Sequence, residues 1–262
     1  MPIRLPNTFL KSTVTASSSF CYNNRIENRP NCTLGFCAYC AKVSPKVHFG
    51  ARCAEARLAI CYNHLMNKLR LKQQLSSFAL SMFRKDFYGI YHGAISAKTE
   101  NNRFLINTRE SIFDAITNEQ LIELYFAKDY RWNNASVDAG IHKGIYAHIT
   151  DAKFVTFSMP PFTTAYSLEH NLIVPKDYFG YKELGDIAIY DPKNFDDWYE
   201  RAITEIPKYF MTERTNIMVI RGYGVYAYNR DLHAMAKQLA ILEKSCRLLM
   251  LEKEDIATDF AY

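Results

Sequence analysis

The chain has 262 residues, of which 48% are hydrophobic, and it carries a formal net charge of +5. With only 10 glycines and 9 prolines it can bury a hydrophobic core, and its composition is not that of a disordered or fibrous protein. No apolar run approaches the roughly 20 residues that a membrane-spanning helix needs, which excludes an integral membrane protein held by such helices.

Basic residues and cysteines are concentrated at the amino terminus. Residues 1–65 contain eight Lys or Arg and two Glu, a net charge of +6, whereas residues 66–262 contain 24 basic and 25 acidic residues. Six of the seven cysteines also precede residue 66, namely Cys21, Cys32, Cys37, Cys40, Cys53 and Cys61. The basic character therefore belongs to the first quarter of the chain and does not indicate a nucleic-acid-binding protein.

Residues 1–65 have three interpretations. An Arg- and Ser-rich, acid-poor start is typical of an organelle transit peptide. Cys37-x2-Cys40 has zinc-ligand spacing, but seven residues separate the next pair, Cys53 and Cys61, which disfavours a small zinc module. We favour a disordered extension or a mis-assigned start before Met66, either of which leaves this segment without function. A disulfide scaffold is disfavoured because nothing indicates secretion.

The first elements of the globular part, residues 66–262, follow from apolar spacing. Near-helical spacing predicts a helix over 66–85, preceded by a short helix around 54–62. Residues 88–98 and 103–107, joined by four polar residues, predict a β-hairpin. Thr117-x-x-Gln120 is a capping-box pattern, which predicts a helix that continues through Phe126.

Alternating helices and strands are predicted for the remainder. Ser136 is expected to cap a helix that carries Ile141, Ile145 and Ile149 on one face. The other predicted elements are a strand over 153–157, a helix over 162–169, a strand over 186–190, a helix over 195–210 interrupted near Pro207, strands over 216–221 and 224–228, and a long helix over 231–252. This order predicts one α/β domain with helices on both faces of a sheet.

Four short motifs succeed one another between residues 75 and 250. They are Gly93-Ala94-Ile95-Ser96, then Ala135-Ser136-Val137-Asp138 followed by His142 and Tyr146, then Phe157-Ser158-Met159-Pro160-Pro161, and finally Gly222-Tyr223-Gly224 before the last helix. In order and spacing the chain resembles the class II aldolase/adducin family, whose corresponding motifs are Gly-Asn-x-Ser, Ser-Ser-Glu, His-x-His-Pro and His-Gly. The resemblance implies a three-layer α/β/α domain of the fuculose-phosphate aldolase type with a central, mostly antiparallel sheet.

The metal-binding motif departs from that family. The resemblance implies a zinc ion held by three histidines and a glutamate that moves the proton. Here the ligand positions hold Phe157, Met159 and Tyr223, which are poor zinc ligands, and the glutamate position holds Asp138, whose reach is shorter. Losing all three ligands leaves no metal site. We therefore expect a degenerate member with no zinc and no metal-dependent aldol cleavage.

Several polar residues remain at positions that the resemblance assigns to the site. The catalytic candidates are Asp138, His142 and Tyr223, and the phosphate- or substrate-binding candidates are Ser96, Thr108, Arg109 and Ser136. Each also has a structural interpretation. Ser136 suits a helix N-cap, Asp138 is stabilised by the helix dipole, and His142 suits a buried, hydrogen-bonded histidine. Tyr223 is expected to fill the volume of the missing metal.

Three functions remain open. The favoured one is a non-catalytic binding or assembly protein of this fold. The second is a lyase or isomerase that acts on a sugar phosphate through metal-independent acid–base chemistry by Asp138, His142 and Tyr223. The third is a conventional aldolase whose metal ligands come from elsewhere, such as His148, His170 or the amino-terminal cysteines.

Partners and compartment are also matters of expectation. The resemblance implies a homo-oligomer, namely a tetramer with its site at a subunit boundary, and a small phosphorylated sugar as ligand. Dinucleotide-binding and P-loop motifs are absent from the sequence, and its aromatic residues form no RNA-binding platform, so no nucleic acid is expected. Cys246 is the only thiol after residue 65, which favours a reducing cytoplasm unless residues 1–65 are a transit peptide.

Overall fold

The computed structural model describes the backbone of residues 51–259 and the side chains of residues 62–252. The Cys37-x2-Cys40 motif and the other amino-terminal features lie outside the described residues. The compact unit that begins at Glu55 contains the sheet and the helices that cover it.

An eight-stranded sheet forms the centre of this unit. Its order is β3-β2-β1-β4-β8-β7-β6-β5, and every neighbouring pair is antiparallel except β6 and β7. The strands are β1 (Ala94–Glu100), β2 (Arg103–Asn107), β3 (Leu121–Tyr125), β4 (Phe154–Ser158), β5 (Leu172–Ile173), β6 (Ile187–Tyr190), β7 (Ile217–Ile220) and β8 (Gly224–Asn229). The predicted central, mostly antiparallel sheet is therefore confirmed.

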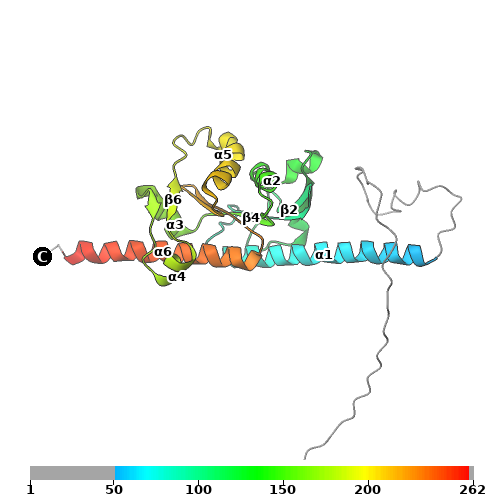
Figure 1. Cartoon of the computed structure of the whole chain (residues 1–262), viewed down its shortest axis with the longest axis horizontal. Coiled ribbons are helices and arrows are strands. Elements are labelled where there is room, and N and C mark those ends of the chain that lie inside the picture. The colour runs from blue at the N-terminus through cyan, green and yellow to red at the C-terminus, as the bar shows by residue number, and fades with distance from the viewer. Residues whose placement is uncertain (1–50, 260–262) are drawn as a thin grey trace, which may run out of the picture. The chain divides into compact units, whose positions relative to one another are not determined.

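Helices cover both faces of the sheet (Figure 1). One face carries α2 (Ala139–His148) and α5 (Trp198–Glu213), and the other carries α1 (Ala51–Phe83), α3 (Pro161–Glu169) and α6 (Leu232–Asp259), with the short α4 (Tyr178–Glu183) against α6. Successive side chains along a strand point to opposite faces, so each strand contributes to both cores. In β8, Val225 and Ala227 pack in the core under α1, α3 and α6. Tyr226, between them, packs in the core under α2 and α5.

The prediction of a helix after Thr117 was wrong. The Gln120 side chain does accept a hydrogen bond from the Thr117 backbone amide at 3.0 Å, as the capping pattern requires. However, only a single turn of 3-10 helix, η2 (Asn118–Gln120), follows before β3 begins. Pairing of β3 with β2 provides hydrogen-bond partners for the backbone instead. The strand conformation also buries the side chains of Leu121 and Leu124.

The expected interruption near Pro207 is also absent. Helix α5 runs through Pro207, whose ring is buried and faces Gly144 of α2. A Cβ at Gly144 would lie 2.9 Å from the Pro207 Cγ and 3.1 Å from the Ile203 carbonyl oxygen. The glycine therefore allows the two helices to approach closely at the turn where proline removes a helical hydrogen bond.

Several element boundaries differ from the predictions. Helix α1 begins at Ala51 instead of residue 66, so it crosses the boundary drawn from composition, and β1 begins at Ala94 instead of residue 88. Asp138 rather than Ser136 occupies the N-cap position of α2. The short elements β5 and α4 were not anticipated, since neither is long enough to show a period in the sequence.

A carboxylate on α6 holds the start of α3. Glu243 accepts hydrogen bonds from the backbone amides of Phe162 at 2.9 Å and Thr163 at 2.8 Å, and from the Thr163 hydroxyl at 2.8 Å. These amides belong to the first turn of α3, where no partner exists within the helix. Glu243 thereby joins two helices of one layer at a negatively charged cap.

Candidate functional site

Asp138 stands at the centre of the candidate site, on the face of the sheet that α2 and α5 cover. Its side chain is buried, and its Oδ1 accepts hydrogen bonds from the hydroxyls of Tyr226 on β8, at 2.8 Å, and Tyr199 on α5, at 3.2 Å. It makes no capping hydrogen bond to α2 although it occupies the N-cap position. One carboxylate thus joins three elements of this layer.

Burial sets the protonation of this group. Removal from water raises the pKa of Asp138, and the two tyrosine hydroxyls oppose that rise. Burial and the carboxylate together raise the pKa values of Tyr226 and Tyr199. The tyrosines therefore remain protonated and donate to Asp138. The charge of Arg109 acts on the pKa of Tyr199 in the opposite direction, which places this exposed arginine within electrostatic range of the site.

Ser96 and His142 form a second hydrogen-bonded group beside Asp138. The Ser96 Oγ lies 2.7 Å from His142 Nδ1 and 2.7 Å from the Tyr146 hydroxyl. His142 and Tyr146 are one turn apart on α2, and both are buried. Burial lowers the pKa of His142 to about 3, so its imidazole is neutral at physiological pH. His142 Nε2 has no hydrogen-bond partner among the described residues.

Two aromatic rings and a thioether occupy the positions at which the resemblance placed metal ligands. The Phe157 ring lies between those of Tyr223 and Tyr226, with centroid separations of 5.0 and 4.8 Å. Met159 packs against the same cluster, and Trp198 approaches Tyr223 edge-on at 6.0 Å. These contacts agree with the expectation that Tyr223 fills space in the core.

The donor set does not fit zinc. Phenylalanine offers no donor atom, a thioether is a weak one for zinc, and burial raises the pKa of the Tyr223 phenol away from the ionised form that would bind a metal. Among the residues that the structure describes, no three His, Cys, Asp or Glu side chains are grouped so as to hold a metal ion.

The loop expected to hold phosphate is closed by packing. Gly93 has φ +145°, and a Cβ there would lie 2.8 Å from Cδ1 of Tyr88. The next residue, Ala94, is fully buried, and the Ser96 hydroxyl already lies between His142 and Tyr146. The glycine is therefore required by φ and by close packing, whatever else the loop does.

The other predicted binding residues lie where two loops run side by side. Thr108 forms an isolated antiparallel bridge with Ala135, and the Ser136 amide donates to the Asn107 carbonyl at 3.0 Å. The Thr108 hydroxyl pairs with that of Ser111 at 2.9 Å. The Ser136 hydroxyl is buried and accepts a hydrogen bond from the Asp138 amide at 3.4 Å. The structure thus brings Ser136 and Asp138 together, as their spacing indicates.

Sequence reasoning missed the two tyrosines that bind Asp138. Tyr226 follows Tyr223 by three residues and shares its side of the sheet with Tyr228, so strand alternation would have placed it on the α2 side. Tyr199 lies 61 residues from Asp138, in the first turn of α5. No local pattern links these residues, because the three elements that carry them meet only in the folded chain.

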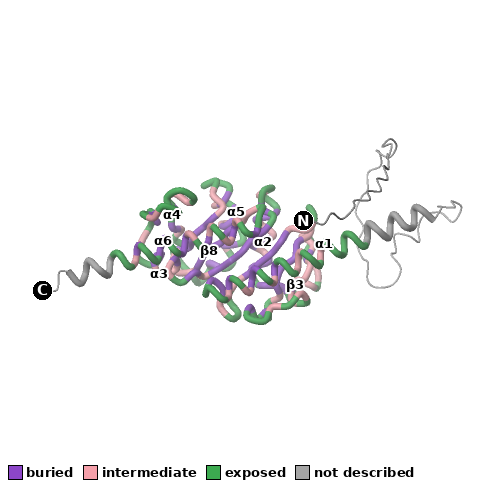
Figure 2. The backbone as a smooth tube through the Cα atoms, turned by 90° about the horizontal axis from the view of Figure 1, so that it is seen from below, coloured by how far each residue is buried: buried purple, intermediate pink, exposed green. Residues whose placement is uncertain are grey.

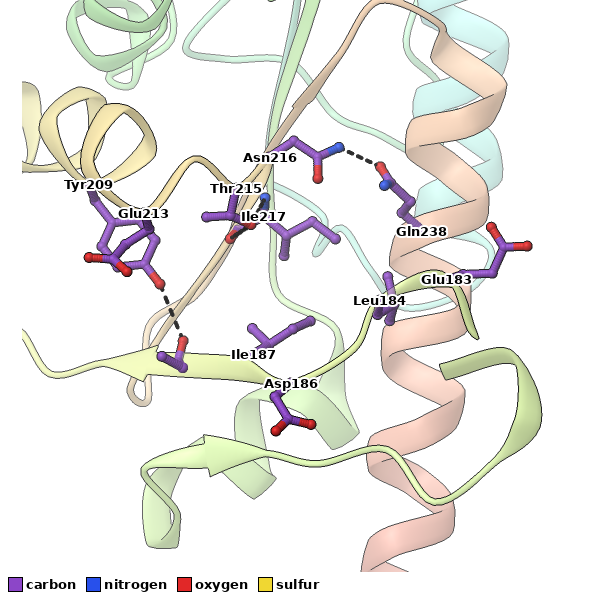
Figure 3. A pocket seen from close by; sticks show the side chains of 11 residues that line it. Glu183, Leu184, Asp186, Ile187, Tyr209, Glu213, Thr215, Asn216, Ile217 and Gln238 are labelled. Atoms are coloured by element: carbon purple, nitrogen blue, oxygen red, sulfur yellow. Dashed lines mark hydrogen bonds between the residues drawn. The ribbon is translucent and has the colours of Figure 1, made fainter. Parts of the chain in front are cut away.

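A separate pocket of about 180 Å³ lies at the amino-terminal ends of β6 and β7, between α4, the end of α5 and α6 (Figure 3). Three carboxylates line it, those of Glu183, Asp186 and Glu213, and the Asn216 amide donates to the Gln238 side chain at 2.8 Å. Lys237 of α6 forms an ion pair with Glu183 at 2.9 Å. This pocket shares no residue with the buried Asp138 site, so the two are separate.

Comparison with known proteins identifies the family. A sequence model described as the class II aldolase and adducin N-terminal domain matches residues 73–250. The chain therefore belongs to the class II aldolase/adducin family, as the resemblance implied. A comparison with curated protein sequences finds no match. Among the described residues, no helix is both long and apolar enough to cross a membrane.

Solved structures of this fold are similar at low sequence identity. The l-fuculose-1-phosphate aldolase from Thermus thermophilus is 19% identical with a TM-score of 0.64, over 73% of this chain and 97% of that one. An aldolase II superfamily protein from Pseudomonas syringae is 17% identical with a TM-score of 0.55, over 72% and 76% of the two chains. A sugar-phosphate aldolase from Thermotoga maritima is 14% identical with a TM-score of 0.53, over 71% and 95%. These likenesses establish the fold.

Proposed function

We propose that this chain is a class II aldolase-like protein that has no metal-dependent aldolase activity and acts as a binding or assembly protein. The observation that carries the proposal is the donor set. Phe157, Met159 and Tyr223 stand at the positions where the family resemblance expects zinc ligands, and their side chains pack as a hydrophobic cluster. Such a cluster is stable without an ion, whereas a zinc site needs donors that this cluster lacks.

The environment of Asp138 supports the same conclusion. A general base must be within reach of its substrate, yet the Asp138 carboxylate is buried, and its Oδ1 accepts hydrogen bonds from Tyr199 and Tyr226. The neutral His142 is also fully buried; Ser96 occupies its Nδ1, and its unpartnered Nε2 is likewise shielded from solvent. Both groups are therefore shielded from solvent in the structure of the single chain.

The proposal extends to partners and place. By the family resemblance we expect a homo-oligomer, in particular a tetramer, and a small phosphorylated sugar as the ligand that the loops around Ser96, Thr108, Arg109 and Ser136 would contact. Of these four side chains only Arg109 is exposed in the single chain. A reducing cytoplasmic compartment suits Cys246, which is buried and unpaired.

Zinc content tests the proposal directly. The full chain, with Cys37→Ser and Cys40→Ser to remove the amino-terminal ligand pair, is dialysed first against zinc and then against buffer, and bound metal is measured by elemental mass spectrometry. We expect less than about 0.1 zinc per chain, because the pocket supplies no set of deprotonated donors.

The control restores the missing donors in the same background. A Phe157→His, Met159→His, Tyr223→His variant that retains its circular dichroism is expected to bind about one zinc per chain, since three imidazoles form a competent set of protein ligands. One tightly bound zinc per chain without these substitutions would contradict the proposal.

The alternative is metal-independent acid–base chemistry on a sugar phosphate by Asp138, His142 and Tyr223. One observation favours it. Tyr199 is 40% exposed and hydrogen-bonded to Asp138, so it offers a proton route between the buried carboxylate and the surface. Neutral His142 would then act as a hydrogen-bond partner and not as an acid.

Turnover of L-fuculose 1-phosphate in the presence of a chelator distinguishes the two functions. We expect none above the uncatalysed background. If cleavage or isomerisation is measured and Asp138→Asn lowers kcat at least about 100-fold, as loss of a general base does, the alternative is correct. Tyr228→Phe is the matched control, since its hydroxyl makes no hydrogen bond to Asp138 and its loss should leave turnover unchanged.

A further inference from the structure

The middle of α1, residues 62–69, carries an apolar face that the domain does not cover. Tyr62 and Leu65 are each 63% exposed, Met66 is 44% exposed and Leu69 is 41% exposed. In Figure 2 this part of α1 is coloured as exposed where it leaves the sheet. It also precedes the residues that the family model matches, which begin at residue 73. The face is therefore an addition to the family domain.

The spacing of these four residues defines one stripe. Their positions are i, i+3, i+4 and i+7, so they lie along about two turns of one helix face. At about 100° per residue, the centre of the stripe is turned on average about 120° around the helix axis from Leu75, Ala79 and Met82, which pack in the core. Helix α1 thus has two apolar faces, and the second is directed away from the sheet.

Positive charge is concentrated in the part of the chain that carries this stripe. Residues 1–85 contain 13 Lys or Arg and two Glu, a net charge of +11, whereas residues 86–262 contain 19 basic and 25 acidic residues, a net charge of −6. No Asp or Glu occurs between Glu55 and Asp86, whereas six Lys or Arg do. A negatively charged partner would therefore be attracted to this end of the chain.

The polar side chains around the stripe differ in what they contact. Lys68 pairs with Glu123 at 2.8 Å, and Lys72 donates to a backbone carbonyl at 3.0 Å, so both are engaged within the fold. Arg70 lies about 80° around the helix axis from Tyr62, on the side of the stripe opposite Lys68 and Lys72. Its side chain is exposed and forms no ion pair among the described residues. Gln73, next along the stripe, is exposed and neutral. The outward face is therefore apolar, with a free positive charge at its edge and no acid.

We propose that this outward face of α1 binds the surface of an anionic lipid bilayer, with the helix lying in the plane of the interface. An apolar stripe on a basic helix is the pattern of a surface-bound helix, because the apolar side chains enter the headgroup boundary while Lys and Arg meet the lipid phosphates. Tyr62, with an apolar ring and a polar hydroxyl, suits that boundary.

Charge distinguishes this occupant from a second copy of the stripe. Pairing α1 of two copies would bring together two helices that each carry four basic and no acidic residues between Glu55 and Phe83, where the helix ends. A bilayer with anionic headgroups instead accepts both the apolar side chains and the positive charge. Because the stripe is only about two turns long, the binding is reversible and depends on salt.

The test uses the full chain and vesicles in a flotation assay. Vesicles of phosphatidylcholine alone are compared with vesicles that also contain phosphatidylglycerol at about 30%, at low and high concentrations of NaCl, about 50 and 500 mM. We expect binding to the anionic vesicles at low salt, and at least about tenfold weaker binding to neutral vesicles or at high salt.

Substitutions on α1 locate the binding. Leu65→Asp with Leu69→Asp removes the apolar part, and Arg70→Glu with Gln73→Glu places acid beside the stripe at two exposed positions. Each pair is expected to weaken vesicle binding at least about tenfold, because an anionic surface repels the new charges. Gln73→Lys is expected to strengthen binding several-fold by adding a basic residue to the same face.

A control pair addresses non-specific loss of apolar surface. Tyr178 and Phe179 of α4 are 69% and 62% exposed, as much as the most exposed residues of the stripe. Tyr178→Asp with Phe179→Asp is therefore expected to leave vesicle binding unchanged. Circular dichroism of every variant verifies that the fold is retained, since all the substituted side chains are exposed.

Three results would overturn the proposal. Equal binding to neutral and anionic vesicles would show that the negative charge of the lipid does not contribute to binding. Unchanged binding by both pairs of α1 substitutions would assign the interaction to another part of the chain. Absence of vesicle binding, together with an oligomer in light scattering that Leu65→Asp with Leu69→Asp dissociates, would assign the stripe to a second copy of the chain.

Discussion

The hydrogen bonds to Asp138 have an energetic consequence that pH reveals. Burial raises the pKa of this carboxyl, so the folded chain favours its protonated form, and the stability that it contributes is lost as pH rises through that raised pKa. The hydroxyls of Tyr226 and Tyr199 limit the loss by donating to the ionised carboxylate. The pair of tyrosines therefore matters most at neutral and higher pH.

Tyr226→Phe is expected to lower the free energy of unfolding by about 1–3 kcal/mol at a pH of about 7.5, because a buried carboxylate loses its shorter hydrogen bond. At a pH of about 4.5, where more of the carboxyl is protonated, the loss should be smaller. Urea unfolding at the two pH values measures the difference. Tyr228→Phe serves as the control on the same strand and should show no such pH dependence. An equal loss at both pH values would mean that Asp138 is not the partner that matters.

Individual residues of the site were only partly predictable. Asp138 and His142 were placed by the order of motifs, and the structure puts both in one buried layer. Tyr199 and Tyr226 were not, because hydrogen bonds between residues 61 and 88 positions apart leave no trace in local spacing. Nor did the loop motif reveal that the Ser96 hydroxyl would be occupied by two side chains of α2.

The stability of α3 as an element depends on α6. Glu243→Gln preserves the shape of the cap but removes its charge, and a neutral amide cannot accept from both amides and the Thr163 hydroxyl as the carboxylate does. We expect a loss of about 1–2 kcal/mol in the free energy of unfolding. Glu252→Gln, in an exposed pair with Lys176, should cost less than about 0.5 kcal/mol. Similar losses in the two variants, measured by urea unfolding, would show that the cap contributes little.

Elements with a long apolar period were predicted best. Strand β4 and helix α3 lie within one residue of their predicted bounds, and helix α6 begins one residue from its predicted start but ends at Asp259, seven residues later than predicted. Burial on one face dictates both the period and the conformation of these elements. The error at β3 arose where a local cap pattern competed with strand pairing, and the pairing stabilised more of the backbone. The predicted interruption of α5 at Pro207 was wrong because the proline ring packs against Gly144, which belongs to a different helix.

On the scale of the whole molecule, the proposed lipid-binding face and the candidate site lie in different layers. Helix α1 covers one face of the sheet with α3 and α6, whereas Asp138 lies under α2 and α5 on the other (Figure 1). A chain held to a bilayer by the outward face of α1 would thus keep the sheet between the lipid and the candidate site. Ligand binding there and attachment at α1 are then expected to be independent.

The contact between Glu243 and α3 also bears on the order in which the chain is built. The backbone amides of Phe162 and Thr163 donate hydrogen bonds to Glu243, which lies 81 and 80 positions later in the chain. During synthesis, α3 leaves the ribosome with its first turn exposed to water, and it obtains its partner only after the entire sheet has been made. The last helix therefore completes the layer, and a nascent chain that stops before it would hold α3 without its cap.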